Sequence, residues 1–142
     1  MRRFIVLAMV LATTLTVAGC SDSTGPQEAL SGTYTLRSVN GSSSSPWLIT
    51  SNASYTDEVL SSTISLDAQG NYSGTTIWRT TNAGAPPFTT KDEITGYWTL
   101  SGSMITLTDT TNPQYPVYYN GTISGSTITI IDPAVGTEVY SK

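Results

Sequence analysis

Histidine is absent from the 142 residues, and cysteine occurs only at position 20. A chain without histidine has no histidine-based catalytic triad and no histidine metal site. The glycine patterns that bind phosphate are absent as well. Six Lys and Arg residues stand against 10 Asp and Glu residues, which gives a net charge of −4 and disfavours nucleic acid as a partner. The sequence therefore predicts a protein that is not an enzyme, needs no cofactor or metal, and binds no nucleic acid.

The long apolar run that the sequence does contain lies at its start. It extends from Phe4 to Thr16 and follows Arg2 and Arg3. A membrane-spanning helix needs about 20 apolar residues, so this run is too short for a lasting anchor. A basic start, a short apolar region and small residues at a cleavage site are typical of a secretory signal peptide, which we place at residues 1–19.

The residues Val17-Ala18-Gly19-Cys20 resemble the lipobox of bacterial lipoproteins. The resemblance implies cleavage before Cys20, a diacylglycerol thioether on its sulfur and acylation of the new amino group. Two or more acyl chains anchor a protein stably to a bilayer. Because Ser21 follows in place of Asp, the best-known sorting rule implies the outer membrane. We thus expect a lipid-anchored protein of the bacterial cell envelope, with the membrane as its partner. Because Cys20 is the only cysteine, its lipidation would leave no cysteine for a disulfide.

Ser and Thr make up about a third of the residues after Cys20, and few segments show helical periodicity. Residues 20–30 comprise the lipidated Cys and a polar, aperiodic stretch that we interpret as a flexible tether. The remainder, 31–142, has the length of a single domain. We expect that domain to be monomeric.

Alternating apolar and polar residues predict about eight strands, mostly joined by hairpin turns. The segments 101–109 and 124–132 repeat a Gly turn followed by an alternating strand that ends on Asp, which indicates a meander. Closing the meander would remove its exposed edges. The sequence predicts an all-β, antiparallel up-and-down barrel, with an open β-sandwich as the alternative. The strands are expected at 33–40, 56–66, 72–80, 89–100, 104–109, 117–123, 127–131 and 136–141.

Several segments within 31–142 resemble bacterial lipocalin-like domains. They are Ser31-Gly32-Thr33-Tyr34-Thr35-Leu36, Asp67-Ala68-Gln69-Gly70-Asn71-Tyr72, Thr95-Gly96-Tyr97-Trp98-Thr99-Leu100-Ser101-Gly102 and Val139-Tyr140-Ser141-Lys142. The resemblance implies a lipocalin-like β-barrel with a calyx able to bind a small apolar ligand.

Two groups of residues are candidates for a ligand site. Aromatic side chains of the expected strands either line a pocket or fill the core; they are Tyr72, Trp78, Trp98 and Tyr119. The longest connection, 41–55, carries Trp47, Leu48 and Ile49, which form either a lid over the barrel mouth or a permanent plug.

The carboxylates give a weaker signal. Asp57-Glu58 and Asp92-Glu93 are adjacent pairs, and adjacent strand residues point to opposite faces. Asp109 and Asp132 end the two copies of the repeat, where a turn residue is expected.

Two functions therefore remain open. The first is a tethered protein that binds a small apolar molecule in a barrel cavity. The second is a protein-binding module with a filled barrel, such as an envelope interaction factor or a hydrolase inhibitor, which would show an exposed apolar patch.

Overall fold

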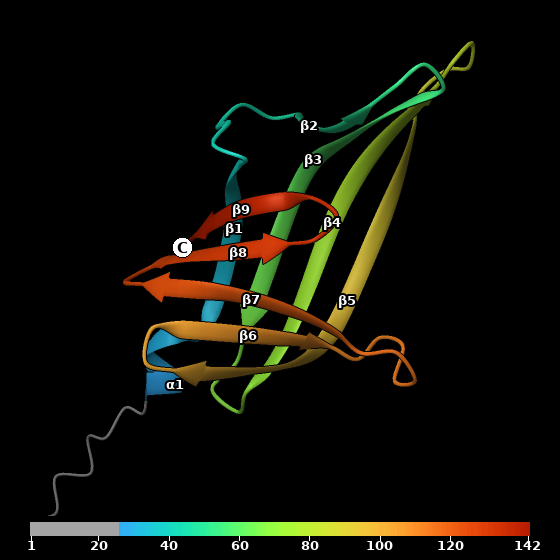
Figure 1. Ribbon diagram of the computed structural model, residues 1–142. Helices are drawn as coiled ribbons and strands as arrows, with labels where there is room; N and C mark the ends of the chain where they lie inside the picture. Colours follow the sequence, from blue (N-terminus) through green and yellow to red (C-terminus); the bar gives the residue numbers. More distant parts are fainter. Residues whose placement is uncertain (1–25) are drawn as a thin grey trace, which may run out of the picture.

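The computed structural model describes residues 26–142, so the predicted signal peptide and the predicted lipidation site, Cys20, lie outside the described residues. One short helix precedes nine strands, all antiparallel to their neighbours (Figure 1). The elements are α1 (Pro26–Leu30), β1 (Gly32–Val39), β2 (Trp47–Ser51), β3 (Tyr55–Leu66), β4 (Asn71–Asn82), β5 (Phe88–Ser101), β6 (Met104–Asp109), β7 (Val117–Ser124), β8 (Thr127–Asp132) and β9 (Gly136–Ser141).

The sheet closes on itself through β1. Its first half pairs with β3, from Gly32 opposite Leu66 to Thr35 opposite Thr63. Its second half pairs with β9, ending at Val39 opposite Glu138. Strands β3 to β9 pair in sequence order. The result is a closed eight-stranded barrel, which confirms the predicted up-and-down barrel and shows that the open sandwich is wrong.

The barrel bends where glycine replaces a side chain. A Cβ at Gly96 would overlap the carbonyl oxygen of Thr108, and one at Gly121 would overlap that of Thr129. Backbones that approach so closely need glycine, and such positions let a strand curve around a barrel. Gly102 and Gly125, the turn glycines of the sequence repeat, have positive φ angles of 62° and 57°, as tight hairpin turns require.

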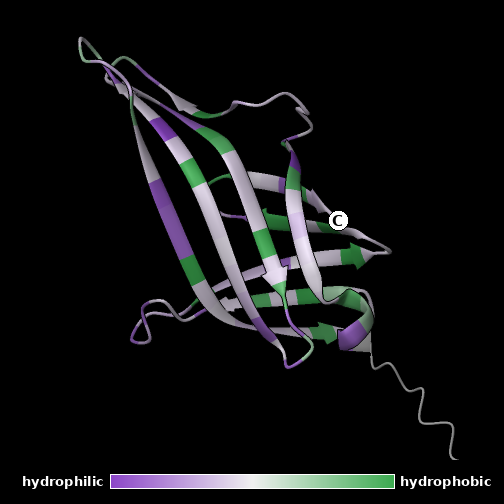
Figure 2. Cartoon of the chain, turned by 180° about the vertical axis from the view of Figure 1, so that it is seen from behind, coloured by the Kyte–Doolittle hydropathy of each residue, from purple (hydrophilic) through white to green (hydrophobic). Residues whose placement is uncertain are grey.

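Alternate residues of most strands are buried in the core, and Figure 2 shows hydrophobic residues spaced along the strands between more polar ones. Ile105 and Leu107 of β6 are buried, as are Ile128 and Ile130 of β8, which is the predicted alternation of the repeat. The even spacing of Leu60, Ile64 and Leu66 in the sequence would place all three on one face of β3, but only Ile64 and Leu66 are buried. A β-bulge between Val59 and Ser61 shifts the register of β3, so Val59 is buried in place of Leu60.

Helix α1 lies at one end of the barrel (Figure 1). Leu30 packs against the core, and the Tyr34 hydroxyl donates to the Leu30 carbonyl at 2.6 Å. The Lys142 ammonium donates to the Ser31 carbonyl at 2.6 Å and lies 5.0 Å from the centre of the Tyr34 ring. Residues 26–30 are therefore part of the folded domain, which corrects the tether predicted over 20–30. No helix among the described residues has the length and apolar composition to cross a bilayer.

The three longest strands, β3, β4 and β5, reach past the others at the end opposite α1 (Figure 1). We call this part the extension. There β5 pairs only with β4, because its pairing with β6 starts at Gly96. Strand β2 runs along β3 from Trp47 opposite Val59 to Ser51 opposite Thr56. The segment 41–55 was predicted as a loop, but it contains this additional strand.

Candidate functional site

A partly open cavity of about 130 Å³ lies inside the barrel, toward the extension. Strands β3 to β9 all contribute side chains to its lining. Ile64, Ile94, Leu107 and Ile130 supply apolar walls. The volume is below the range of drug-sized pockets and close to that of a cavity that accepts one benzene ring.

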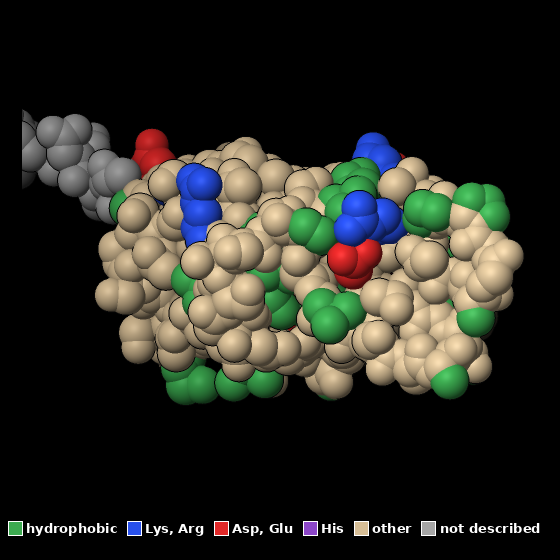
Figure 3. Space-filling model, turned by 90° about the horizontal axis from the view of Figure 1, so that it is seen from above, with side chains coloured by type: hydrophobic (Ala, Val, Ile, Leu, Met, Phe, Trp, Pro, Cys, Tyr) green, Lys and Arg blue, Asp and Glu red, His purple; other side chains and the backbone are tan. Residues whose placement is uncertain are grey.

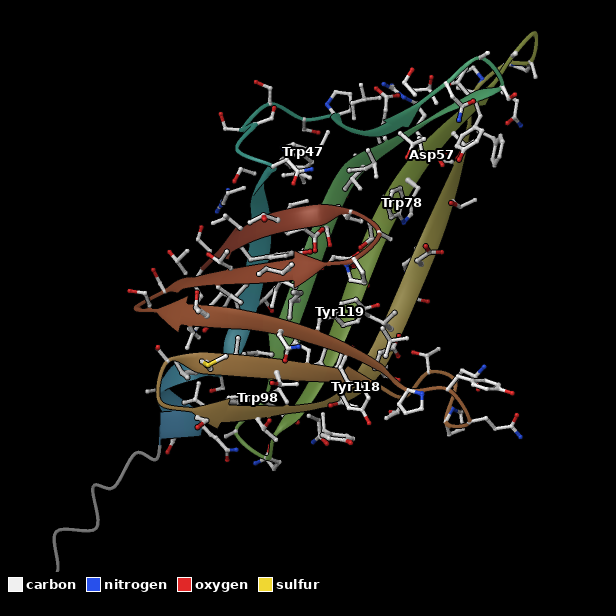
Figure 4. The ribbon with its side chains drawn as sticks, in the orientation of Figure 1. Trp47, Asp57, Trp78, Trp98, Tyr118 and Tyr119 are labelled. Carbon is white, nitrogen blue, oxygen red and sulfur yellow. The ribbon has the colours of Figure 1, made fainter. Side chains whose placement is uncertain are left out.

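Two of the four predicted aromatic residues line this cavity. Trp78 comes from β4 and Tyr119 from β7 (Figure 4). Trp98 is 1% exposed, and its indole nitrogen donates to the Asp67 carbonyl at 3.1 Å in the turn between β3 and β4. Tyr72 is also buried away from the cavity lining. Of the two roles predicted for these aromatic residues, Trp78 and Tyr119 line a pocket, whereas Trp98 and Tyr72 fill the core.

The three predicted lid or plug residues lie on β2, outside the cavity lining. Trp47 is buried, and its indole nitrogen donates to the Ser42 carbonyl at 2.8 Å. Ile49 packs partly buried against the core, whereas Leu48 is exposed. Trp47 is therefore placed as a core residue beside Val59 and not as a cover over the cavity.

Three carboxylates line the cavity: Asp92 on β5, Asp132 at the end of β8 and Glu138 on β9. Asp92 faces the cavity while Glu93 pairs with Lys91 outside it, as adjacent strand residues should. The Asp132 carboxylate also accepts the backbone N–H groups of the turn that follows, from Ala134 at 2.6 Å and from Val135 at 2.9 Å. The predicted role of Asp132 as a turn residue is confirmed, and its side chain also lines the cavity.

The basic side chains of residues 26–142 do not line the cavity. The ion pairs found within residues 26–142 join Arg79 to Glu58 at 2.7 Å and Lys91 to Glu93 at 2.6 Å. Arg37 donates to the Ser141 hydroxyl. No Lys or Arg of this part of the chain lines the cavity.

Glu138 is the most deeply buried of the cavity carboxylates, at 8% exposure. Burial raises its pKa to about 7, and the negative charge of Asp132 adds to the rise, while a hydrogen bond from Tyr140 opposes it. The Tyr140 hydroxyl lies 3.1 Å from the Ser62 hydroxyl, which in turn lies 2.8 Å from that of Thr76. This row of hydroxyls runs from β9 across β3 to β4 along the cavity.

Trp78 carries an unused donor. Its indole N–H is buried and has no acceptor among the described residues. A buried donor without a partner costs about 1–3 kcal/mol. A ligand or water that accepts this hydrogen bond would offset that cost.

Sequence reasoning missed Glu138, Tyr140 and Ser62 as site residues. A signal was present for Glu138, because it stands two positions before the buried Tyr140 and so shares its inward face. No group of three or more His, Cys, Asp or Glu side chains in the described region is arranged to hold a metal ion.

The surface seen from above shows mainly neutral polar side chains and backbone, with few charged groups and scattered hydrophobic side chains (Figure 3). No family model, curated protein or solved structure matches the chain.

Proposed function

We propose that this protein is a lipid-anchored lipoprotein of the bacterial cell envelope whose barrel binds a small molecule in the cavity at the extension end. The observation that carries the proposal is a cavity with apolar walls that also holds the Trp78 N–H, which is buried without an acceptor, and the Glu138 carboxylate, which is buried without a cationic partner. Empty apolar cavities do occur in proteins, but buried polar groups are nearly always paired. A ligand of about one ring with polar substituents would pair them.

The position of α1 suits a tethered binding protein. The chain enters the domain at the α1 end, and the cavity lies toward the opposite end. From an anchor at Cys20 to Pro26 an extended chain would reach roughly 20 Å. With that anchor, the cavity would face away from the bilayer and be open to solutes of the envelope.

The predicted apolar character of the ligand fits one part of the cavity. Ile64, Ile94 and Leu107 would contact a ring or a short hydrocarbon chain. The barrel fold agrees with the fold that the lipocalin-like segments imply, and this agreement supports a proposal of membership in that family.

The direct test is native mass spectrometry of the full mature protein, released from detergent after purification from bacterial membranes. We expect a small molecule to co-purify with the wild-type protein. Ile94→Phe, which fills the cavity, should remove it, whereas Ile131→Phe should retain it, because Ile131 is 64% exposed on the outer face. Equal retention by both variants would show that the molecule binds elsewhere.

A protein-binding module is the second candidate function. Tyr55 and Phe88 are exposed on the strands of the extension, and Leu48 is exposed on the adjoining strand β2. Exposed apolar side chains are used in protein interfaces. Under this alternative, Phe88→Glu would abolish capture of a partner by cross-linking in intact cells. Ile94→Phe would leave that capture unchanged.

A further inference from the structure

We propose that the cavity selects a small organic cation: an ammonium group attached to an apolar body of about one ring. This inference rests on the proposed function and narrows it to one class of ligand. The expectation of a purely apolar ligand is thereby modified, since the apolar body remains and a positive charge is added.

The charges around the cavity have one sign. Asp92, Asp132 and Glu138 approach it from three different strands, and no Lys or Arg of residues 26–142 lines it. Four basic residues lie in that range, and their hydrogen bonds and ion pairs are with groups outside the cavity: Arg37 with Ser141, Arg79 with Glu58, Lys91 with Glu93, and Lys142 with the Ser31 carbonyl. An anionic ligand would be repelled, while a cation would be attracted by all three carboxylates.

Glu138 is the carboxylate that we expect to pair with the ammonium group of the ligand. The side chain lines the cavity, is more than nine-tenths buried and has no cationic partner in the described chain. Buried charges in proteins are normally paired, because an isolated carboxylate loses its hydration without compensation. An ammonium group in the cavity would supply the missing partner. The neighbouring hydroxyls of Tyr140 and Ser62 add polar contacts along the same wall.

The aromatic residues fit the same ligand. Trp78 and Tyr119 line the cavity from β4 and β7 (Figure 4), and the faces of aromatic rings attract ammonium groups, Trp most strongly. Burial raises the pKa of the Tyr119 hydroxyl, and the negative charges of Asp132, Asp109 and Glu138 add to the rise. The unpaired Trp78 N–H is a second, independent sign of an absent ligand, because it would donate a hydrogen bond to an oxygen of a ligand or of a water that the ligand brings.

Three probes of equal size separate charge from shape. Benzylamine, benzyl alcohol and benzoate carry the same ring with a positive, neutral and negative substituent at pH 8. Each is titrated by calorimetry into the full mature protein in detergent. We expect benzylamine to bind at least tenfold more tightly than benzyl alcohol, and benzoate to bind most weakly.

Two substitutions and one control locate the charge. Glu138→Gln should weaken benzylamine binding by about tenfold or more and leave benzyl alcohol unchanged. Asp92→Asn should weaken benzylamine by a smaller factor, and since Asp92 is exposed it serves as the variant that preserves folding. Glu93→Gln, the adjacent residue outside the cavity, should leave both affinities unchanged.

The outcomes are distinct. If benzyl alcohol binds as tightly as benzylamine, the cation inference is wrong and the proposed small-molecule function stands. If none of the three probes binds and no molecule co-purifies, both are wrong. If calcium displaces benzylamine with high affinity, the carboxylates form a metal site, and the organic-cation inference is overturned.

Discussion

The buried carboxyl of Glu138 should make the stability of the free protein fall as the pH rises. Its pKa is raised from 4.5 to about 7 in the folded state. Between these two values the folded state holds a proton that the unfolded state has released, so the stabilisation is complete below about pH 4.5 and is lost as the pH rises through 7. At about 1.4 kcal/mol for each pKa unit, the loss is about 3 kcal/mol.

A loss of this size is a large share of the stability of a small domain, typically about 5–15 kcal/mol. Among the groups around Glu138, the negative charge of Asp132 adds to the rise in its pKa and the hydrogen bond from Tyr140 opposes it. Asp132 on β8 and Asp92 on β5 are acidic, Tyr119 and Tyr140 are neutral in this range, and none of the cavity residues is basic. Glu58 and Asp67, whose pKa values are lowered by hydrogen bonds, titrate below the window.

The assay is urea unfolding, followed by tryptophan fluorescence, of ligand-free protein at pH 5, 6, 7 and 8. The free energy of unfolding of the wild type should decline over this range. Glu138→Gln keeps the shape of the side chain without the charge, so its profile should be nearly flat, and it should be more stable than the wild type at pH 8. Glu93→Gln, exposed on the outer face, should retain the wild-type slope. A wild-type profile that is flat or rises from pH 5 to 8 would refute the reasoning.

Three further predictions concern packing and anchoring. Trp47→Ala removes a buried indole and should cost about 3–5 kcal/mol in urea unfolding, whereas Leu48→Ala on the exposed face of β2 should change it by less than about 0.5 kcal/mol; a similar cost for both would contradict their placement. Gly121→Ala forces a Cβ against the Thr129 carbonyl and should destabilise by about 1–3 kcal/mol in the same assay, and an unchanged midpoint would mean that the strands separate there at little cost. Cys20→Ser should abolish labelling by a radioactive fatty acid and leave a precursor of unchanged length, and a variant still cleaved and membrane-bound would disprove the lipobox interpretation.

Local sequence decided most of the strands. Period-two alternation and a glycine turn are properties of a few neighbouring residues, so 104–109 and 127–131 were predicted within a residue or so of β6 and β8. Closure was also predicted, with an open sandwich as the alternative, because pairing of the last and first strands removes the exposed edges of a meander. The pairing of β9 with β1 agrees with that argument.

The elements that were missed depend on pairing between strands and on side-chain contacts with Tyr34 and Lys142. The bulge at Leu60 and the strand at Trp47–Ser51 arise where β2 and β4 pair with β3. Helix α1 has five residues, too few to be stable alone, and it is held by the carbonyl contacts of Tyr34 and Lys142. The Lys142 contact joins residues 113 positions apart, so no local pattern of the sequence contains both of its partners.

The candidate site, like these elements, could be predicted from the sequence only in part. The sequence by itself determined that Asp92 and Glu93 face opposite ways, that Asp132 ends a strand, and that Trp78 and Tyr119 lie within strands. It did not determine that Asp92, Asp132 and Glu138 surround one cavity, because they come from three strands whose relative positions depend on the register of the whole closed sheet. The side-chain alternation along a strand is fixed by the backbone, but the depth of each residue in the barrel is fixed by how every strand is staggered against its neighbours, and only the tertiary structure decides that.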